Sequence, residues 1–406
     1  MKQKCSDPII SLSVRELVEW VLRDGDIDNR AAGIPEETAM LLGASVHRKL
    51  QREQAGTYTA EVPLSFSFPL ESDREGEDPA VLQVSGRADG VIREVKEDRE
   101  FVTIDEIKGV FRDIAAMEEP EKVHLAQAEM YAFMTAEAED LSEIGVQMTY
   151  VQLETEEERS PHPFRPEDVR RFTKTYSRSE IRETVLSYVE GYRRWAFFTL
   201  RHRSERNASA DGFSFPFSYR PGQKTMVSNT YRAIESGTHL FLQAPTGIGK
   251  TLGVLYPAIR AVGAGLGEKI FYLTAKTLTG TVLEDGMRIM TGKGLRFSFI
   301  KITAKEKACP YDGGICDPVH CDRAKGHYSR VNDAIYDLIT AESLISAETV
   351  SEYAEKHSVC PYEFSLDVSM FVDVILCDYN YVFDPRVYFR RYFGTGSGKY
   401  LFLIDE

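Results

Sequence analysis

The chain has 406 residues, of which 43% are hydrophobic and 28% are charged, and this length predicts two or three domains. The sequence has no run of about 18 apolar residues that could span a membrane, and its N-terminus lacks the apolar core of a signal peptide. The net charge of −14 argues weakly against non-specific attraction to nucleic acid. We therefore expect a cytoplasmic protein with no membrane partner.

The first half of the chain mixes helices with β-like runs. Ser13-Val14-Arg15-Glu16 has the form of a capping box and predicts the start of a helix. The acidic stretch 71–78 is expected to be a loop. The other expected elements are a helix at 36–53, strands at 58–69, 81–86, 88–95 and 101–107, a helix at 121–136, a strand near 145–153, and a long helix at roughly 166–204.

Residues 207–212 form the best linker in the chain, because they are small and turn-forming. After them strands and helices alternate, which is typical of a parallel sheet covered by helices. The expected fold class is therefore α/β, with domains at 1–206 and 213–406. The second domain is expected to contain strand 239–243, helix 250–263, strand 269–274, helix 276–290, strand 297–302, a cysteine-rich insertion at 305–368, and strands near 372–378 and 400–404.

A basic segment precedes the second domain. Residues 170–224 carry twelve basic and five acidic residues. Two interpretations stay open: a solvated linker helix, and a surface that faces nucleic acid.

The strongest motif is Ala-Pro-Thr-Gly-Ile-Gly-Lys-Thr at residues 244–251, between the apolar run 240–242 and an apolar helix. Backbone N–H groups of such a loop cradle phosphates at a helix N-terminus, while the lysine reaches the β- and γ-phosphates and the threonine holds Mg²⁺. The motif therefore predicts ATP and Mg²⁺ binding. The residues expected at the nucleotide are Thr246, Gly247, Ile248, Gly249, Lys250 and Thr251.

Residues outside the loop extend this nucleotide site. Gln223 is a candidate adenine reader, because an amide pairs with the N6/N7 edge of adenine. Lys276 and Thr277 end a predicted strand, where a contact with the DNA backbone would lie. Asp405 and Glu406 follow the last apolar strand; we expect Asp405 to hold Mg²⁺ and Glu406 to orient the attacking water.

Four of the six cysteines cluster in the second domain: Cys309, Cys316, Cys321 and Cys360. Without a secretory signal, such clustering indicates metal or cluster ligation before disulfides. Zinc is the chemical alternative to an iron–sulfur cluster, although its usual paired C-x₂₋₄-C spacing is absent. Cys377 is expected in the core of a strand, and Cys5 as a free surface thiol.

Residues 213–406 resemble the first motor domain of superfamily 2 helicases of the XPD/DinG family. The resemblance rests on the phosphate loop, Thr274-Ala275-Lys276-Thr277, the final Asp-Glu, Cys360-Pro361-Tyr362 and the run 377–385. It implies a RecA-like parallel sheet, an ATP-dependent DNA helicase of repair or recombination that tracks single-stranded DNA, and a [4Fe–4S] cluster on the four clustered cysteines, in preference to zinc. Such a motor needs a second RecA-like domain. We therefore expect this chain to be the N-terminal part of a longer polypeptide that cannot unwind DNA alone.

The first half carries a second constellation. Glu106 and Lys108 are two apart on a predicted strand, so they share a face, and Asp89 lies on the strand before. Paired acids hold Mg²⁺ and a lysine orients the nucleophile in phosphodiester cleavage. His47, on the preceding helix, could complete the metal site, and the pair Gln127 and Tyr131 on the following helix share one face suited to DNA phosphate.

This order of residues resembles RecB-type nucleases of the PD-(D/E)XK superfamily over about residues 10–200. The resemblance implies an α/β nuclease domain at 1–206 that cuts DNA with Mg²⁺. Two alternatives stay open for the whole chain. The N-terminal fold could be a non-catalytic DNA-binding module, or the chain could be an ATP-binding switch that regulates a partner.

Overall fold

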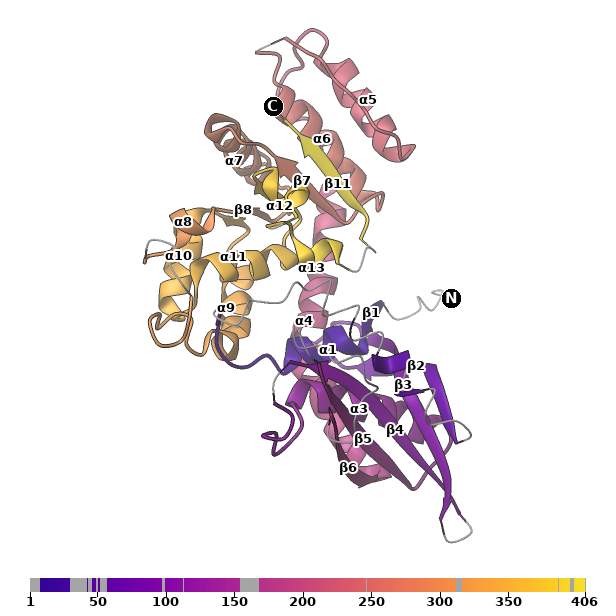
Figure 1. The fold of residues 1–406 in the computed structure, drawn as a ribbon. Coiled ribbons are helices and arrows are strands. Elements are labelled where there is room, and N and C mark those ends of the chain that lie inside the picture. The colour runs from indigo at the N-terminus through magenta and orange to yellow at the C-terminus, as the bar shows by residue number, and fades with distance from the viewer. Residues whose placement is uncertain are drawn as a thin grey trace, which may run out of the picture. The chain divides into compact units, whose positions relative to one another are not determined.

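The protein, seen in a computed structural model, divides into two compact units (Figure 1). One comprises residues 1–23 with 31–198, and the other comprises residues 24–30 with 199–406. In the part of the chain that the structure describes, no helix combines the length and the apolar character needed to cross a membrane. The described residues are 8–29, 42, 46–48, 50–51, 57–96, 99–111, 113–153, 168–245, 247–311, 316–385, 387–394 and 398–405.

The N-terminal unit is built on a mixed six-stranded sheet. Its strands are β1 (Ile9–Ser13), β2 (Tyr58–Leu70), β3 (Ala80–Lys96), β4 (Arg99–Val110), β5 (Glu143–Gln152) and β6 (Val169–Ser177). They lie in the order β1–β3–β4–β5–β6, and β2 pairs with β3. The pairs β1·β3 and β4·β5 are parallel, and the others are antiparallel.

Helices α1 (Val14–Val21) and α3 (Lys122–Ala138) belong to this unit, and the long helix α4 (Arg178–Ala210) begins in it. The predicted capping box of α1 is confirmed, because Ser13 Oγ accepts from Glu16 N at 3.1 Å and Glu16 Oε2 accepts from Ser13 N at 2.7 Å. Helix α3 packs on β2, β3, β4 and β5 and against α1. Every residue from 126 to 136 is buried, as expected for a helix that is enclosed on all sides.

The predicted strands 81–86 and 88–95 prove to be one strand, β3. Gly86 stays in the ladder opposite Leu64, and Arg87 stays opposite Pro63. A Cβ at position 86 would lie 2.6 Å from Tyr131 Oη. The glycine therefore permits a close approach of α3 and does not interrupt the strand.

The helix predicted at roughly 166–204 begins only at Arg178. The prediction was therefore wrong for the residues before 178. Residues 169–177 form β6, antiparallel to β5. Phe172 and Tyr176 are aromatic, and Thr173 and Thr175 are β-branched, which favours a strand over a helix. Most of the predicted helix 36–53 lies outside the described residues; the backbone is helical at 42, 46–48 and 50–51.

The C-terminal unit contains a five-stranded, fully parallel sheet. Its strands are β7 (Lys269–Leu273), β8 (Phe299–Lys301), β9 (Leu344–Ile345), β10 (Val374–Cys377) and β11 (Tyr400–Ile404), in the order β11–β7–β10–β8–β9. Strands β7 and β10 are apolar along almost their whole length, as expected where helices cover both faces. The predicted α/β class is confirmed for this unit.

The larger helices of this unit are α5 (Gln223–Glu235), α6 (Lys250–Gly263), α7 (Thr277–Gly292), α9 (His327–Ala341), α10 (Ala347–Lys356) and α11 (Pro361–Val368). Short turns of helix are α8 (Lys305–Ala308), η2 (Ser369–Phe371), α12 (Asn380–Phe383) and α13 (Arg390–Phe393). The range predicted for α6 is confirmed at both ends. The region predicted as an insertion also contributes strand β9 to the sheet.

The predicted strand 239–243 is absent, because its described residues form no ladder. Phe241 is 96% exposed, and Leu240 is exposed as well. An apolar run becomes a strand only when a neighbour offers it backbone partners. Strand β11 pairs with β7, and no described residue pairs with its other edge.

The predicted linker 207–212 is wrong over its first four residues, which continue α4. The last turns of α4 are tied to the start of β10: Arg206 Nη1 lies 3.0 Å and His202 Nε2 lies 2.8 Å from the buried carboxylate of Asp373. Burial alone would raise the pKa of Asp373, but the hydrogen bond from His202 and the charge of Arg206 outweigh it and lower the pKa. Ala210 is buried in the core of this unit, so its small side chain serves packing and not flexibility.

Candidate functional sites

The six residues predicted for a nuclease site lie together in the N-terminal unit. They are His47 on the helical residues 46–48, Asp89 on β3, Glu106 and Lys108 on β4, and Gln127 and Tyr131 on α3. The β3–β4 ladder ends at the pair Gly90 and Asp105. Asp89 and Glu106 come directly after this last pair, at the point where β3 and β4 stop pairing.

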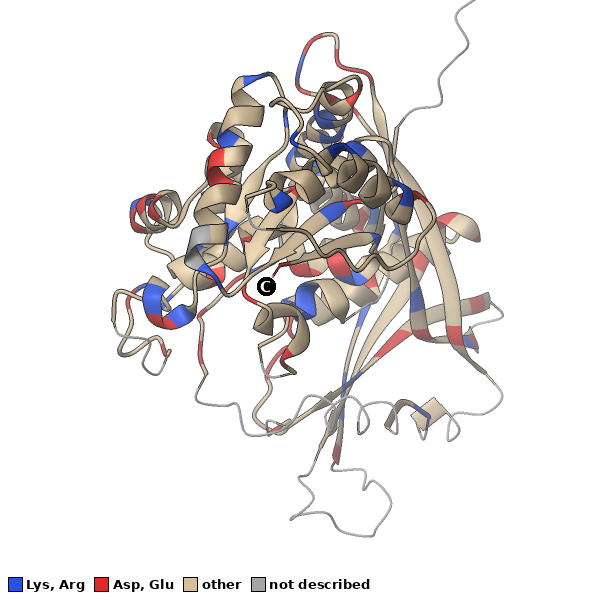
Figure 2. Cartoon of the chain, turned by 90° about the horizontal axis from the view of Figure 1, so that it is seen from above, with Lys and Arg blue, Asp and Glu red and all other residues tan. Residues whose placement is uncertain are grey.

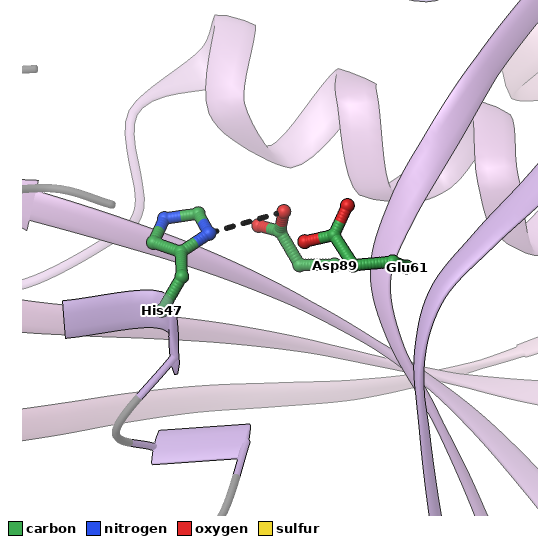
Figure 3. Close-up of side chains that lie close together, drawn as sticks. All are labelled: His47, Glu61 and Asp89. Atoms are coloured by element: carbon green, nitrogen blue, oxygen red, sulfur yellow. Dashed lines mark ion pairs between the residues drawn. The ribbon is translucent and has the colours of Figure 1, made fainter. Parts of the chain in front are cut away.

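Asp89 links the histidine to the backbone of β4. His47 Nδ1 lies 3.3 Å from Asp89 Oδ1, and Ile107 N donates to Asp89 Oδ2 at 2.8 Å (Figure 3). Burial lowers the pKa of His47, but the hydrogen bond and the charge of Asp89 outweigh that effect and raise the pKa above its ordinary value. The carboxylate of Asp89 is thereby oriented from two sides.

Lys108 holds the next part of the site. Its Nζ donates to Glu106 Oε1 at 2.9 Å and to Gln127 Oε1 at 2.8 Å. Glu106 is 5% exposed, and among the described residues its Oε2 has no hydrogen-bond partner. Burial raises the pKa of Glu106 to about 7, although the charge of Lys108 opposes this. A buried, unpartnered carboxylate oxygen beside Asp89 is a donor that suits a divalent cation.

Gln127 and Tyr131 are buried, at 5% and 7% exposure, and do not lie on an open surface. The amide oxygen of Gln127 is engaged by Lys108, and Tyr131 Oη lies against Gly86. Burial and the nearby charge of Glu106 raise the pKa of Tyr131. Gln127 therefore holds Lys108 in place, and the contact of Gln127 and Tyr131 with DNA phosphate stays a prediction.

Glu61 on β2 also reaches this site, and the sequence patterns do not identify it. The ligand atoms of His47, Glu61 and Asp89 all lie within 4.8 Å of one another. Figure 3 shows the carboxylates of Asp89 and Glu61 side by side. Pairing β2 with β3 in register would have been needed to find Glu61, because it faces Asp89 across those strands.

The basic segment 170–224 is partly neutralised. Arg178 and Arg182 lie within 4 Å of Glu137, Arg193 pairs with Asp73 at 2.8 Å, and Arg206 pairs with Asp373. Figure 2 shows Lys and Arg interspersed with Asp and Glu along the chain. These pairs reduce the positive charge that nucleic acid would meet and favour the interpretation as a solvated helix over much of α4.

In the C-terminal unit the phosphate loop leads into α6 as predicted. Gly247 and Gly249 adopt left-handed backbone angles, with φ of 84° and 82°, which favour glycine at both positions. Gly249 is the N-cap of α6, and Lys250 and Thr251 form its first turn. A cavity of about 560 Å³ opens here and is lined by the loop together with Arg220, Gln223, Lys276 and Asp405.

Gln223 is buried against the loop, at 4% exposure. Its Oε1 accepts from Arg220 N at 3.1 Å, and its Nε2 donates to Gly249 O at 3.3 Å. A Cβ at position 249 would lie 2.7 Å from that Nε2, so glycine is needed for this approach. The structure therefore gives Gln223 a role in holding the loop, while adenine recognition stays a prediction.

The two predicted Mg²⁺ residues of the motor meet at Tyr272 on β7, which the sequence patterns missed. Tyr272 Oη lies 3.1 Å from Asp405 Oδ2 and also hydrogen-bonds the side chain of Thr251. Burial and the charge of Asp405 raise the pKa of this phenol, so it stays a hydrogen-bond donor. A tyrosine within the apolar run 269–273 carries no motif that would have revealed this.

The remaining residues predicted for the motor lie in different surroundings. Lys250 Nζ donates to Ala244 O at 3.3 Å, and Ile248 Cδ1 is 3.5 Å from where a Cβ on Gly222 would be. Lys276 lines the cavity of the phosphate loop, so its contact with DNA stays a prediction. The predicted residues Thr246 and Glu406 lie outside the described residues, as does the side chain of Thr277.

Three of the four clustered cysteines share a neighbour in Lys305, at the start of α8. Its ammonium hydrogen-bonds Cys316, and the charges of Cys316, Cys360 and Cys309 raise its pKa against the opposing effect of burial. Cys360 is the N-cap of α11, and its backbone N–H donates to His327 Nδ1 at 3.2 Å. Cys321 lies in a turn that its N–H closes on Asp317 O. The described cysteines form no disulfide, and Cys377 is buried on β10 as predicted.

Comparison with known proteins finds a family model and relatives that match part of the chain. Residues 301–406 match the family model DEAD_2. The chain is 23% identical over 240 residues to "Regulator of telomere elongation helicase 1 homolog" of Caenorhabditis briggsae, a match that covers 49% of this chain and 24% of that protein. It is 22% identical over 201 residues to "General transcription and DNA repair factor IIH helicase subunit XPD" of Dictyostelium discoideum, covering 43% of this chain and 26% of that protein.

The chain thus spans about a quarter of the length of the curated relatives it matches. A solved structure titled "XPD_Helicase" is 19% identical and covers 47% of this chain and 32% of that chain, with a TM-score of 0.32. A score this low gives no basis for comparing the two folds.

Proposed function

We propose that this chain belongs to an ATP-dependent DNA helicase of the XPD type whose N-terminal unit is an Mg²⁺-dependent DNA nuclease. The observation that carries the motor assignment is the phosphate loop at the N-terminus of α6, in a chain that also matches DEAD_2. For the nuclease, the support is the convergence of His47, Asp89, Glu106 and Lys108 from three elements around one unpartnered carboxylate oxygen. That arrangement favours a catalytic site over a non-catalytic DNA-binding module.

In the motor, the N-terminus of α6 and the loop glycines would bind the phosphates of ATP. Lys250 would contact the β- and γ-phosphates, and Thr251 with Asp405 would hold the Mg²⁺ that neutralises their charge. Tyr272 keeps both of these side chains in place through its hydroxyl. Glu406 would orient the attacking water, and the substrate would be DNA with a single-stranded region.

In the nuclease, His47, Asp89 and Glu106 would hold Mg²⁺. A bound Mg²⁺ supplies an activated water and offsets the charge that develops on the phosphodiester. Lys108, held between Glu106 and Gln127, would orient the nucleophile toward the phosphorus. Asp89 is fixed by the backbone of Ile107, so this cleavage site is built before any cation arrives.

A digestion assay tests the nuclease proposal. We expect the chain to cut single- or double-stranded DNA with Mg²⁺ and not with chelator, and we expect Asp89→Ala to abolish the cutting. ATP, added in parallel reactions, reports whether the two units are coupled. Unchanged Mg²⁺-dependent cutting by Asp89→Ala would remove the nuclease assignment.

We also propose that Cys309, Cys316, Cys321 and Cys360 hold a [4Fe–4S] cluster. Lys305 hydrogen-bonds Cys316 and is near enough to Cys309 and Cys360 for their charges to raise its pKa, and this nearness of three thiols to one residue supports shared ligation. Protein prepared without oxygen is expected to be brown and to contain about four iron atoms per chain, as the cluster formula requires. A colourless preparation that contains zinc and no iron would overturn this assignment.

A further inference from the structure

We propose that residues 24–29 form a strap that docks on the cysteine-rich region and couples the proposed iron–sulfur cluster to the N-terminal unit. The inference rests on the proposed cluster and goes beyond the two proposed activities. Residues 24–30 belong to the C-terminal unit, although the stretches on either side of them, 1–23 and 31–198, belong to the N-terminal unit. The chain therefore enters the C-terminal unit at residue 24 and leaves it again after residue 30.

The backbone of the strap is hydrogen-bonded to the loop 316–326, which carries two of the proposed cluster ligands. Asn29 N donates to Cys316 O at 2.9 Å, and Ile27 N donates to Ala324 O at 3.0 Å. Ala324 N in turn donates to Cys321 O at 3.1 Å. The side chain of Ile27 is buried, at 6% exposure. Backbone bonds of this kind hold an extended segment in place, and one buried side chain fixes its register.

The strap also caps helix α9, which follows that loop. Gly326 is the N-cap of α9 and has no side chain that could accept from the first N–H groups of the helix. Gly25 O accepts from Tyr328 N at 3.0 Å, and Asp26 Oδ1 accepts from Gly326 N at 2.5 Å. The helix dipole favours the negative charge of Asp26 at this end. Figure 1 shows the indigo segment that follows α1 beside α9. The cap of α9 thus comes from a distant part of the sequence.

The first turn of α9 supports a further cluster ligand. His327 is fully buried there, and its Nδ1 accepts from Cys360 N at 3.2 Å. Through the loop and through α9, the strap is therefore tied to the backbone at Cys316, Cys321 and Cys360. A cluster held by those thiols would fix the loop and the helix start that the strap needs as partners. Loss of the cluster would free the loop and leave the strap without fixed partners.

The strap is held weakly enough to respond to this loop. Within the described residues 24–29, Ile27 is the buried side chain, while Asp26 and Asn29 are exposed. Segments with few buried apolar contacts and with exposed hydrogen bonds open locally before the rest of a protein unfolds. Docking costs less conformational entropy when the loop is already ordered, so a bound cluster shifts this local equilibrium toward the docked strap. The state of the cluster thereby reaches the N-terminal unit through the chain itself.

Hydrogen exchange with mass spectrometry tests this inference on the whole chain, with its cluster and after a chelator has removed the iron. The peptide that contains Ile27 and Asn29 is expected to exchange about 5–150-fold faster without the cluster, the usual range of coupling between two sites. Peptides from the buried segment 126–136 of α3 are expected to exchange alike in both forms. They report that the N-terminal unit stays folded when the iron is removed.

Asp26→Ala gives the reverse measurement. This variant removes the carboxylate that accepts from Gly326 N, so the loop opens more often and a chelator reaches the cluster sooner. The visible absorbance of the cluster is expected to bleach about fivefold faster than in the unaltered chain, the factor that losing one helix cap produces. The matched control is Asp78→Ala, which changes an exposed aspartate before β3 and is expected to bleach at the unaltered rate.

The outcomes separate this inference from the proposal on which it rests. If the chain contains iron but the Ile27 peptide exchanges equally fast with and without the cluster, the strap is not coupled and the cluster proposal stands. Bleaching of Asp26→Ala at the unaltered rate leads to the same conclusion. If the purified chain contains no iron, the cluster proposal and this inference fail together.

Discussion

Replacement of Lys108 by alanine is expected to lower the rate of Mg²⁺-dependent DNA cleavage by about 10²–10⁴-fold, the range for losing one positioned catalytic group. Lys108 is the only cation that the described residues hold against both Glu106 and Gln127. Its removal leaves two buried acceptor oxygens without a donor, at a cost of about 1–3 kcal/mol each at most, so the protein is expected to remain folded. The loss should appear in kcat and leave KM little changed, because the lysine acts on the reacting groups.

The variant also has a pH signature. The positive charge of Lys108 favours the ionised form of Glu106, so its loss raises the pKa of Glu106 further. Since the cation needs the ionised carboxylate, the acidic limb of Mn²⁺ binding is expected to move to higher pH. Well above about pH 7, binding should approach that of the unaltered chain while cleavage stays lost.

The matched control is Lys122→Ala, which removes an exposed lysine at the start of α3. It is expected to cut DNA at the unaltered rate. Cleavage by Lys108→Ala within a few-fold of the unaltered chain would show that the lysine only stabilises Glu106.

The grouping of side chains at the N-terminal site was predictable where local sequence decides which of them share a face. Glu106 and Lys108 are two residues apart on one strand and therefore share a face. Gln127 and Tyr131 are about one helical turn apart and therefore share a face of their helix. Glu61 was not predictable in this way. Its position depends on the register of β2 against β3 and on a left-handed backbone angle, and neither leaves a mark in a short window of sequence.

The same distinction holds in the C-terminal unit. The bounds of α6 follow from glycine at its N-cap and an apolar helical repeat, which are local signals. The strand expected at 239–243 was not found, because an apolar run becomes a strand only by pairing with a neighbour, and a short window of sequence does not show whether that pairing forms. The linker expected at 207–212 failed because Ala210 is small for packing, a tertiary cause that composition cannot separate from flexibility.

Lys250→Ala is expected to weaken binding of a non-hydrolysable ATP analogue with Mg²⁺ by about 10–100-fold. A hydrogen bond to a charged group contributes about 1.5–3 kcal/mol, and each 1.4 kcal/mol is a factor of ten in affinity. The only partner that the described residues give Lys250 is the carbonyl of Ala244, so its loss is expected to leave the unfolding temperature nearly unchanged.

Lys224→Ala is the matched control for calorimetric titration, because this exposed lysine lies on the second residue of α5 and not in the lining of the cavity. It should bind the analogue as the unaltered chain does. Equal affinity in Lys250→Ala would mean that the left-handed loop at Gly247 and Gly249 does not hold triphosphate, and the motor assignment would then fail. A selective loss in Lys250→Ala would instead tie nucleotide binding to the first turn of α6, where Thr251 and Tyr272 already orient Asp405.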